Sequence, residues 1–178
     1  MKYDWNKEKY LAIKDEDLPE KPSKEMHHIS SAPAFPLPIY VWKKQSKELM
    51  YSYAIEQLED LRELLLDCEL KTAVKIRNQG WKHITNMVIA EIVYDSEFGF
   101  EPIPKEIYHV YINNEKRIIS LVGPNEGSLY DEYLGSVQAR ADKSFKIVHS
   151  TNNLDDLIKT GVPRIPPEYK HILKPFIE

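Results

Sequence analysis

The sequence predicts an α+β fold: a two-helix hairpin packed on a small antiparallel β-meander of about four strands, flanked by extended, proline-rich tails. Apolar residues recur at helical spacing in the middle of the chain, short β-rich segments follow, and prolines concentrate near both ends. A hydrophobic fraction of 42% in 178 residues is sufficient for one packed core. We therefore expect an arm over residues 1–45, an α+β core domain over 46–150, and a short helix with an extended tail over 151–178.

The N-terminal arm is expected to be extended. Pro33, Pro36 and Pro38 fall within six positions, a spacing that excludes a helix interior or a central strand. A flexible linker would be polar, yet this stretch is apolar. An extended apolar segment needs a surface to lie on, so we expect its large side chains to contact a partner protein or, alternatively, to fold back on the chain's own core. These side chains are Phe35, Leu37, Tyr40 and Trp42.

Two helices are predicted between residues 46 and 94. Ser46 is the expected N-cap of the first helix. Its apolar residues follow steps of three and four, namely Met50, Ala54, Leu58, Leu61, Leu65, Cys68 and Thr72. A second stripe runs from about Trp81 to Tyr94, and Gly80 predicts a break between the two helices because glycine costs about 1 kcal/mol inside a helix. Both stripes are interpreted as core, with a short coiled coil as the alternative.

Four strands are predicted after Pro102 and Pro104 end the helical region. The β-rich segments are residues 107–112, 117–122, 133–139 and 144–149, and their tight spacing predicts antiparallel pairing. Asn113, Asn114 and Glu115 form the first expected turn.

A short helix is predicted over residues 153–159, and a second proline-punctuated stretch follows it to the end of the chain. Its apolar side chains are expected to contact partners as those of the arm do, or alternatively to fold back on the chain's own core. They are Ile165, Tyr169, Leu173 and Phe176.

A pair of His-x-Thr triplets is the sharpest catalytic pattern. His83 and Thr85 form one triplet, and His149 and Thr151 form the other. Metal-independent two-histidine phosphodiesterases use such a pair, with one imidazole as general base and the other as general acid, and the hydroxyls would hold phosphate. However, such triplets arise easily by chance among six histidines. In that fold both triplets lie on paired strands, whereas His83 falls in a predicted helix, so the sequence favours a protein that is not an enzyme.

Other classes of function find little support in the sequence. No cofactor-binding glycine loop or HExxH motif is present, and the adjacent His27 and His28 would diverge, so neither a cofactor nor a metal is expected. A formal charge of -4 with no basic run argues against nucleic acid. No stretch resembles a secretory signal or a transmembrane segment of about 20 apolar residues. We expect a soluble intracellular protein, in the cytoplasm, cytoskeleton or cilium rather than the mitochondrion.

Four short motifs between residues 106 and 145 carry a family resemblance. In order, they are Glu106-Ile107-Tyr108-His109-Val110-Tyr111, Ile119-Ser120-Leu121-Val122-Gly123-Pro124-Asn125-Glu126, Glu132-Tyr133-Leu134-Gly135-Ser136 and Asp142-Lys143-Ser144-Phe145. This set resembles an uncharacterised domain family that includes bacterial proteins and a small human protein named only for its open reading frame on chromosome 1. The resemblance covers residues 55–150 and implies helices followed by strands, but no reaction or cofactor. Gly127 stands where members of the family usually have a tryptophan.

The expected function is that of a structural or adaptor subunit whose tails wrap partner proteins in a cytoskeletal, ciliary, mitochondrial or phage-type assembly. Besides the phosphodiesterase, a peptide-binding module is the alternative, with Tyr108, Tyr111 and Tyr133 as an aromatic platform. That alternative requires exposed tyrosines, and at least two of the three are expected to be buried.

Overall fold

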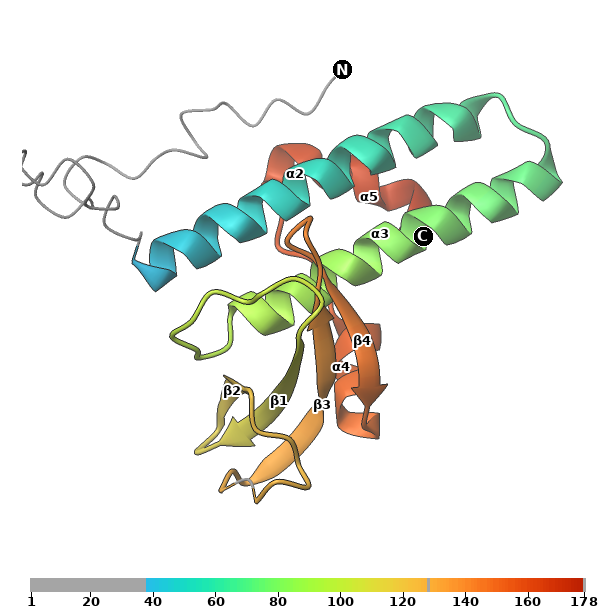
Figure 1. Cartoon of the computed structure of the whole chain (residues 1–178). Helices are drawn as coiled ribbons and strands as arrows, with labels where there is room; N and C mark the ends of the chain where they lie inside the picture. Colours follow the sequence, from blue (N-terminus) through green and yellow to red (C-terminus); the bar gives the residue numbers. More distant parts are fainter. Residues whose placement is uncertain (1–37, 128, 178) are drawn as a thin grey trace, which may run out of the picture.

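Two long antiparallel helices form the larger part of the fold. The computed structural model describes residues 38–127 and 129–177. Helix α2 spans Ile39–Leu66 and helix α3 spans Leu70–Tyr94, and they form the predicted hairpin (Figure 1). The turn between them lies at residues 67–69, so the first predicted helix, which ran to Thr72, ends earlier than expected.

The N-terminus of α2 differs from the prediction. The helix begins at Ile39, inside the expected arm, and Ser46 is buried within it rather than capping it. Val41 is buried and the Trp42 ring packs against Tyr94, with ring centroids 6.0 Å apart. These tertiary contacts outweigh the weak helix propensity of the first residues after the prolines.

The predicted break at Gly80 is wrong, because α3 continues through this residue. A Cβ atom at Gly80 would overlap the Phe176 ring, so the glycine is required for close packing. Gly80 therefore allows α3 and α5 to approach each other closely, and it does not bend α3.

Four antiparallel strands form the sheet, and the α+β prediction is confirmed. They are β1 (Ile107–Asn113), β2 (Lys116–Ser120), β3 (Glu132–Ala139) and β4 (Phe145–Ser150). The spatial order is β2-β1-β3-β4, which places β1 and β3 in the centre. Asn114 and Glu115 both have positive φ, as the two-residue type I′ turn between β1 and β2 requires.

The inner face of the sheet joins the helices in one hydrophobic core. Tyr108, Val110, Val137 and Phe145 are buried in the same cluster as the apolar residues of α2 and α3. The outer face carries polar and aromatic side chains, described below. The pairing register shifts at Val110/Tyr111 between β1 and β3, and at Ser136/Val137 between β3 and β4.

The C-terminal segment is not the extended tail that the prolines predicted. After α4 (Asn152–Thr160), a short 3₁₀ helix η3 (Pro167–Tyr169) leads into α5 (Lys170–Ile177). Helix α5 contacts both α2 and α3, and Ile172, Leu173 and Phe176 are buried in the core. Burial of these side chains stabilises a helix despite Pro175 in its last turn.

Candidate interaction surface

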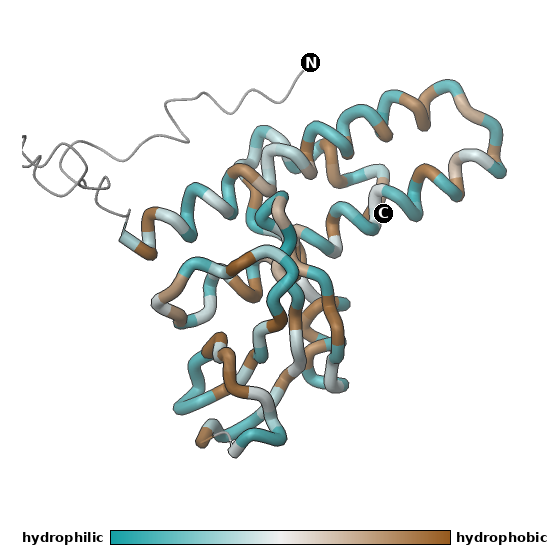
Figure 2. Tube along the Cα trace, in the orientation of Figure 1, coloured by the Kyte–Doolittle hydropathy of each residue, from teal (hydrophilic) through white to brown (hydrophobic). Residues whose placement is uncertain are grey.

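The distal part of the helical hairpin lies outside the core. The last buried residue of α2 is Leu61 and the first of α3 is Ile76. We call residues 62–75 between them the hairpin end, and Figure 1 shows it projecting beyond α5. Apolar positions are visible along it in Figure 2.

The hairpin end exposes large aliphatic side chains. Their exposed fractions are 58% for Leu64, 77% for Leu66, 86% for Leu70 and 57% for Val74. Trp81, farther along α3, is 46% exposed. Scattered apolar side chains are normal on a protein surface, but a group of them on one projecting element is typical of a contact site.

Charge is divided between the two helices of the hairpin, over a longer stretch than the hairpin end itself. Residues 56–69 hold six acidic side chains and one arginine, a formal charge of -5: Glu56, Glu59, Asp60, Arg62, Glu63, Asp67 and Glu69. Residues 70–83 hold four basic side chains and no acidic one, a formal charge of +4: Lys71, Lys75, Arg77 and Lys82. The ion pairs of the described residues, within 4.0 Å, lie elsewhere. These charged side chains therefore have no close partner of opposite charge, and all of them except Glu59 and Arg62 are exposed.

A second polar feature lies on the outer face of the sheet. His109 Nδ1 is 2.7 Å from Ser136 Oγ, and Ser136 Oγ is 2.6 Å from the Tyr133 hydroxyl. The Tyr133 hydroxyl is in turn 3.3 Å from His149 Nδ1, and the His149 ring stacks on the Tyr133 ring. This network joins β1, β3 and β4 through side chains. Ser136 is buried, so its hydroxyl is not accessible as a nucleophile, and the network stabilises the sheet.

His109 has a perturbed protonation equilibrium. Burial lowers the pKa of its imidazole below the ordinary value, and the Glu126 carboxylate acts in the opposite direction. Glu126 also accepts a hydrogen bond from the Gly123 backbone N–H, at 3.1 Å. The neutral form of His109 is therefore favoured in the folded protein.

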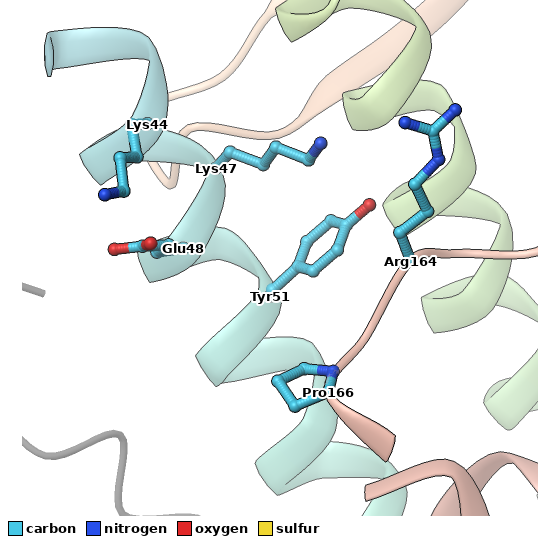
Figure 3. A pocket seen from close by; sticks show the side chains of 6 residues that line it. All are labelled: Lys44, Lys47, Glu48, Tyr51, Arg164 and Pro166. Carbon is cyan, nitrogen blue, oxygen red and sulfur yellow. The ribbon is translucent and has the colours of Figure 1, made fainter. Parts of the chain in front are cut away.

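A pocket of about 300 Å³ lies between α2 and the segment before η3 (Figure 3). It is lined by Lys44, Lys47, Glu48, Tyr51, Arg164 and Pro166. Lys47 forms ion pairs with Glu91 and Asp95 at 3.7 and 3.2 Å, and the Tyr51 hydroxyl donates to the Met87 carbonyl at 3.2 Å. Lys47 and Tyr51 are thus bonded within the protein, whereas Glu48 Oε2 is buried without a hydrogen-bond partner among the described residues, and burial raises the pKa of this carboxyl group.

The structure does not place the two His-x-Thr triplets on neighbouring strands. His83 and Thr85 lie within α3, which packs on the inner face of the sheet. His149 lies at the end of β4, exposed on the outer face, and the Thr151 hydroxyl donates to the Leu134 carbonyl at 2.7 Å. The paired strands required by the two-histidine phosphodiesterase are therefore absent at His83.

The residues predicted to contact a partner near the C-terminus lie against the chain's own core. Ile165, Leu173 and Phe176 are buried in the chain's own core, and Tyr169 is half-buried against it. The fold uses these four to attach its C-terminus, which corresponds to the alternative that this segment folds back on the chain's own core.

The contacts predicted in the arm are only partly described. Trp42 is half-buried against Tyr94, while Tyr40 is 59% exposed. Phe35 and Leu37 lie outside the described residues.

The three tyrosines do not form one platform. Tyr108 is buried on the inner face, and Tyr111 is buried beneath Tyr130 and Tyr133 on the outer face. The Tyr111 hydroxyl donates to the Val122 carbonyl at 2.8 Å. The expectation that at least two would be buried is confirmed.

Sequence reasoning missed the hairpin end. The predicted core stripe continued through it as Leu65, Cys68 and Thr72, and no role was predicted for its exposed apolar residues. The signal that could have found it was the change from acidic to basic residues near position 70. Within residues 38–127 and 129–177, no cluster of three or more His, Cys, Asp or Glu is arranged to hold a metal ion. None of the described helices has the length and apolar content to cross a bilayer.

Comparison with known proteins adds no assignment. No protein-family model, curated protein or solved structure gives a significant match to this chain. The resemblance of residues 55–150 to the uncharacterised family therefore stays a prediction.

Proposed function

We propose that the protein is a non-catalytic structural or adaptor subunit of an intracellular protein assembly, and that the hairpin end is its main docking surface. The observation that carries this proposal is the exposure of Leu66, Leu70 and Val74 on an element that projects beyond the core. Burying each such side chain contributes about 1.5–3 kcal/mol. A partner that covers them would thus gain affinity that the isolated chain does not use.

The N-terminal arm is proposed as a second contact. Tyr40 remains exposed at the start of α2, and Phe35 and Leu37 precede it in the sequence. Aromatic side chains are favoured anchors at interfaces. The candidate assemblies are cytoskeletal or ciliary ones first, then mitochondrial ones or a phage-type particle.

The test is purification of the tagged full chain from its native cell, comparing the wild type with Leu70→Asp/Val74→Asp. Both positions are exposed, so the variant should fold normally. We expect proteins that co-purify at near-equal amounts with the wild type to be lost with this variant.

Leu121→Asp/Val162→Asp is the matched control, since these residues are similarly exposed but lie away from the hairpin end. The control should retain the same co-purifying proteins. An identical set with all three tagged chains, with the untagged copy of this chain counted among the co-purifying proteins, would contradict docking through the hairpin end.

A further inference from the structure

We propose that the partner of the hairpin end is a second copy of this chain. This inference rests on the proposed function and names the occupant of that surface. The argument is charge complementarity: residues 56–69 carry -5 and residues 70–83 carry +4, and within the hairpin end the two halves carry -2 and +2, so each copy offers both signs to the other. A dimer with two-fold symmetry uses the same patch on both subunits, and a surface with both signs can complement itself.

The symmetry axis follows from this charge division. If two hairpins stack face to face about an axis parallel to their helices, α2 of one copy lies over α3 of the other. An axis perpendicular to the helices places α2 over α2 and α3 over α3, which brings like charges together. The parallel axis is therefore selected, and both hairpin ends then point the same way.

The spacing of side chains on α3 suits such a stack. Leu70, Val74 and Trp81 are four and seven residues apart, so they share one face of the helix. Each is followed by a lysine, namely Lys71, Lys75 and Lys82. Because one residue turns the helix by about 100°, a basic stripe flanks the apolar one. An apolar seam bordered by charges is the usual organisation of a helix–helix interface.

The apolar seam supplies the affinity and the charges set the orientation. An exposed ion pair adds little affinity, whereas like charges in contact discriminate against the wrong arrangement. Helix hairpins that pair in this way form a four-helix bundle.

The first experiment measures the mass of the purified full chain by light scattering from about 1 to 100 μM, a range that brackets micromolar association. We expect a species of twice the 20.9 kDa of one chain. Leu70→Asp/Val74→Asp should raise the dissociation constant by more than about 1,000-fold and leave the chain monomeric over this range, because a symmetric dimer loses two buried aliphatic contacts from each copy. Leu121→Asp/Val162→Asp should leave it unchanged.

Charge-swap variants test the arrangement. Glu56→Lys/Glu59→Lys/Glu63→Lys turns the acidic side from -5 to +1, and Lys71→Glu/Lys75→Glu/Lys82→Glu turns the basic side from +4 to -2. Each variant alone then opposes like charges and should be monomeric. A mixture of the two should form a heterodimer, because the acidic side of one copy again faces the basic side of the other.

Cys68, the single cysteine, reports the direction of the two copies. It lies in the turn of the hairpin, so the parallel axis brings both thiols to the same end, about 10–15 Å apart at ordinary helix spacing. A short bis-maleimide should therefore link the two chains of the wild-type dimer.

The outcomes separate this inference from the proposed function. A monomer at every concentration would overturn the inference, and co-purifying proteins lost with Leu70→Asp/Val74→Asp would then still support docking to a different protein. A dimer that survives this substitution, or charge-swap variants that do not pair, would also overturn it. If the purified chain is monomeric and no co-purifying protein depends on the hairpin end, both proposals fail.

Discussion

Single residues decide how closely the elements of this fold approach one another. Gly80 leaves room for the Phe176 ring, which fixes α5 on the hairpin. Gly135 plays a similar part in the sheet, since a Cβ atom there would lie 2.5 Å from the His149 carbonyl oxygen and 2.5 Å from Leu154 Cδ2. At both positions the missing side chain is required by tertiary packing.

Gly80→Ala should lower the free energy of unfolding by about 1–3 kcal/mol, because overpacking against Phe176 exceeds the gain of about 1 kcal/mol in helix propensity. Urea denaturation measures this change. In the Phe176→Ala background the same substitution should be neutral or stabilising. Equal losses in the two backgrounds would show that the clash with Phe176 is not the cause.

Stability should also depend on the protonation of His109. Since burial lowers the pKa of His109 in the folded protein, the unfolded chain binds the proton more readily near its ordinary pKa of about 6.5. The contribution of His109 to the free energy of unfolding is therefore complete above about pH 6.5. This contribution is lost as the pH falls through the lower pKa that His109 has in the folded protein.

Urea denaturation between pH 8 and 5 checks this prediction. The loss of stability on acidification should be smaller for His109→Gln than for the wild type. His171→Gln, an exposed position on α5, is the control and should follow the wild type. A steeper loss for His109→Gln would contradict the account.

At the scale of elements, the sequence predicted the four strands and the presence of two helices, because their periodicity comes from burial on one side. It did not predict α5, since Pro163, Pro166, Pro167 and Pro175 indicate an extended chain and the stabilising contacts come from distant helices. The start of α2 and the course of α3 through Gly80 were missed for the same reason. Local signals cannot report a contact between residues 80 and 176.

Removal of residues 167–178 should abolish cooperative folding or lower the melting temperature by more than about 10 °C. Ile172, Leu173 and Phe176 are buried, and at about 1.5–3 kcal/mol each their loss is comparable with the whole stability of a domain. Thermal unfolding followed by circular dichroism measures the effect. A near-normal transition would show that α5 is dispensable.

Removal of residues 1–37 is the complementary truncation. If the arm serves a partner, the melting temperature should change by less than about 3 °C, since the core of residues 38–177 keeps its contacts. A large loss of stability would instead show that the arm belongs to the chain's own fold, and it would remove the arm from the proposed interface.

At the scale of the whole molecule, other elements of the fold cover one part of the helical hairpin and leave the hairpin end uncovered. Helix α5 covers the hairpin as far as Gly80, and the hairpin end extends beyond this cover. The sequence contained the charge division, but only the arrangement of elements shows which apolar residues remain exposed. The exposure of the candidate surface therefore depends on the whole fold and cannot be predicted from the sequence of the hairpin end alone.

The most direct measurement of the central claim is photo-crosslinking in the native cell, with a photoreactive amino acid at position 66, 70 or 74 of the full chain. Position 162, which is 65% exposed and lies between α4 and η3, is the control. The account predicts one discrete cross-linked product from the hairpin positions, with the mass of two copies of the chain, and no product from position 162. Absence of a discrete product from all three hairpin positions would contradict the claim that this surface is a protein interface.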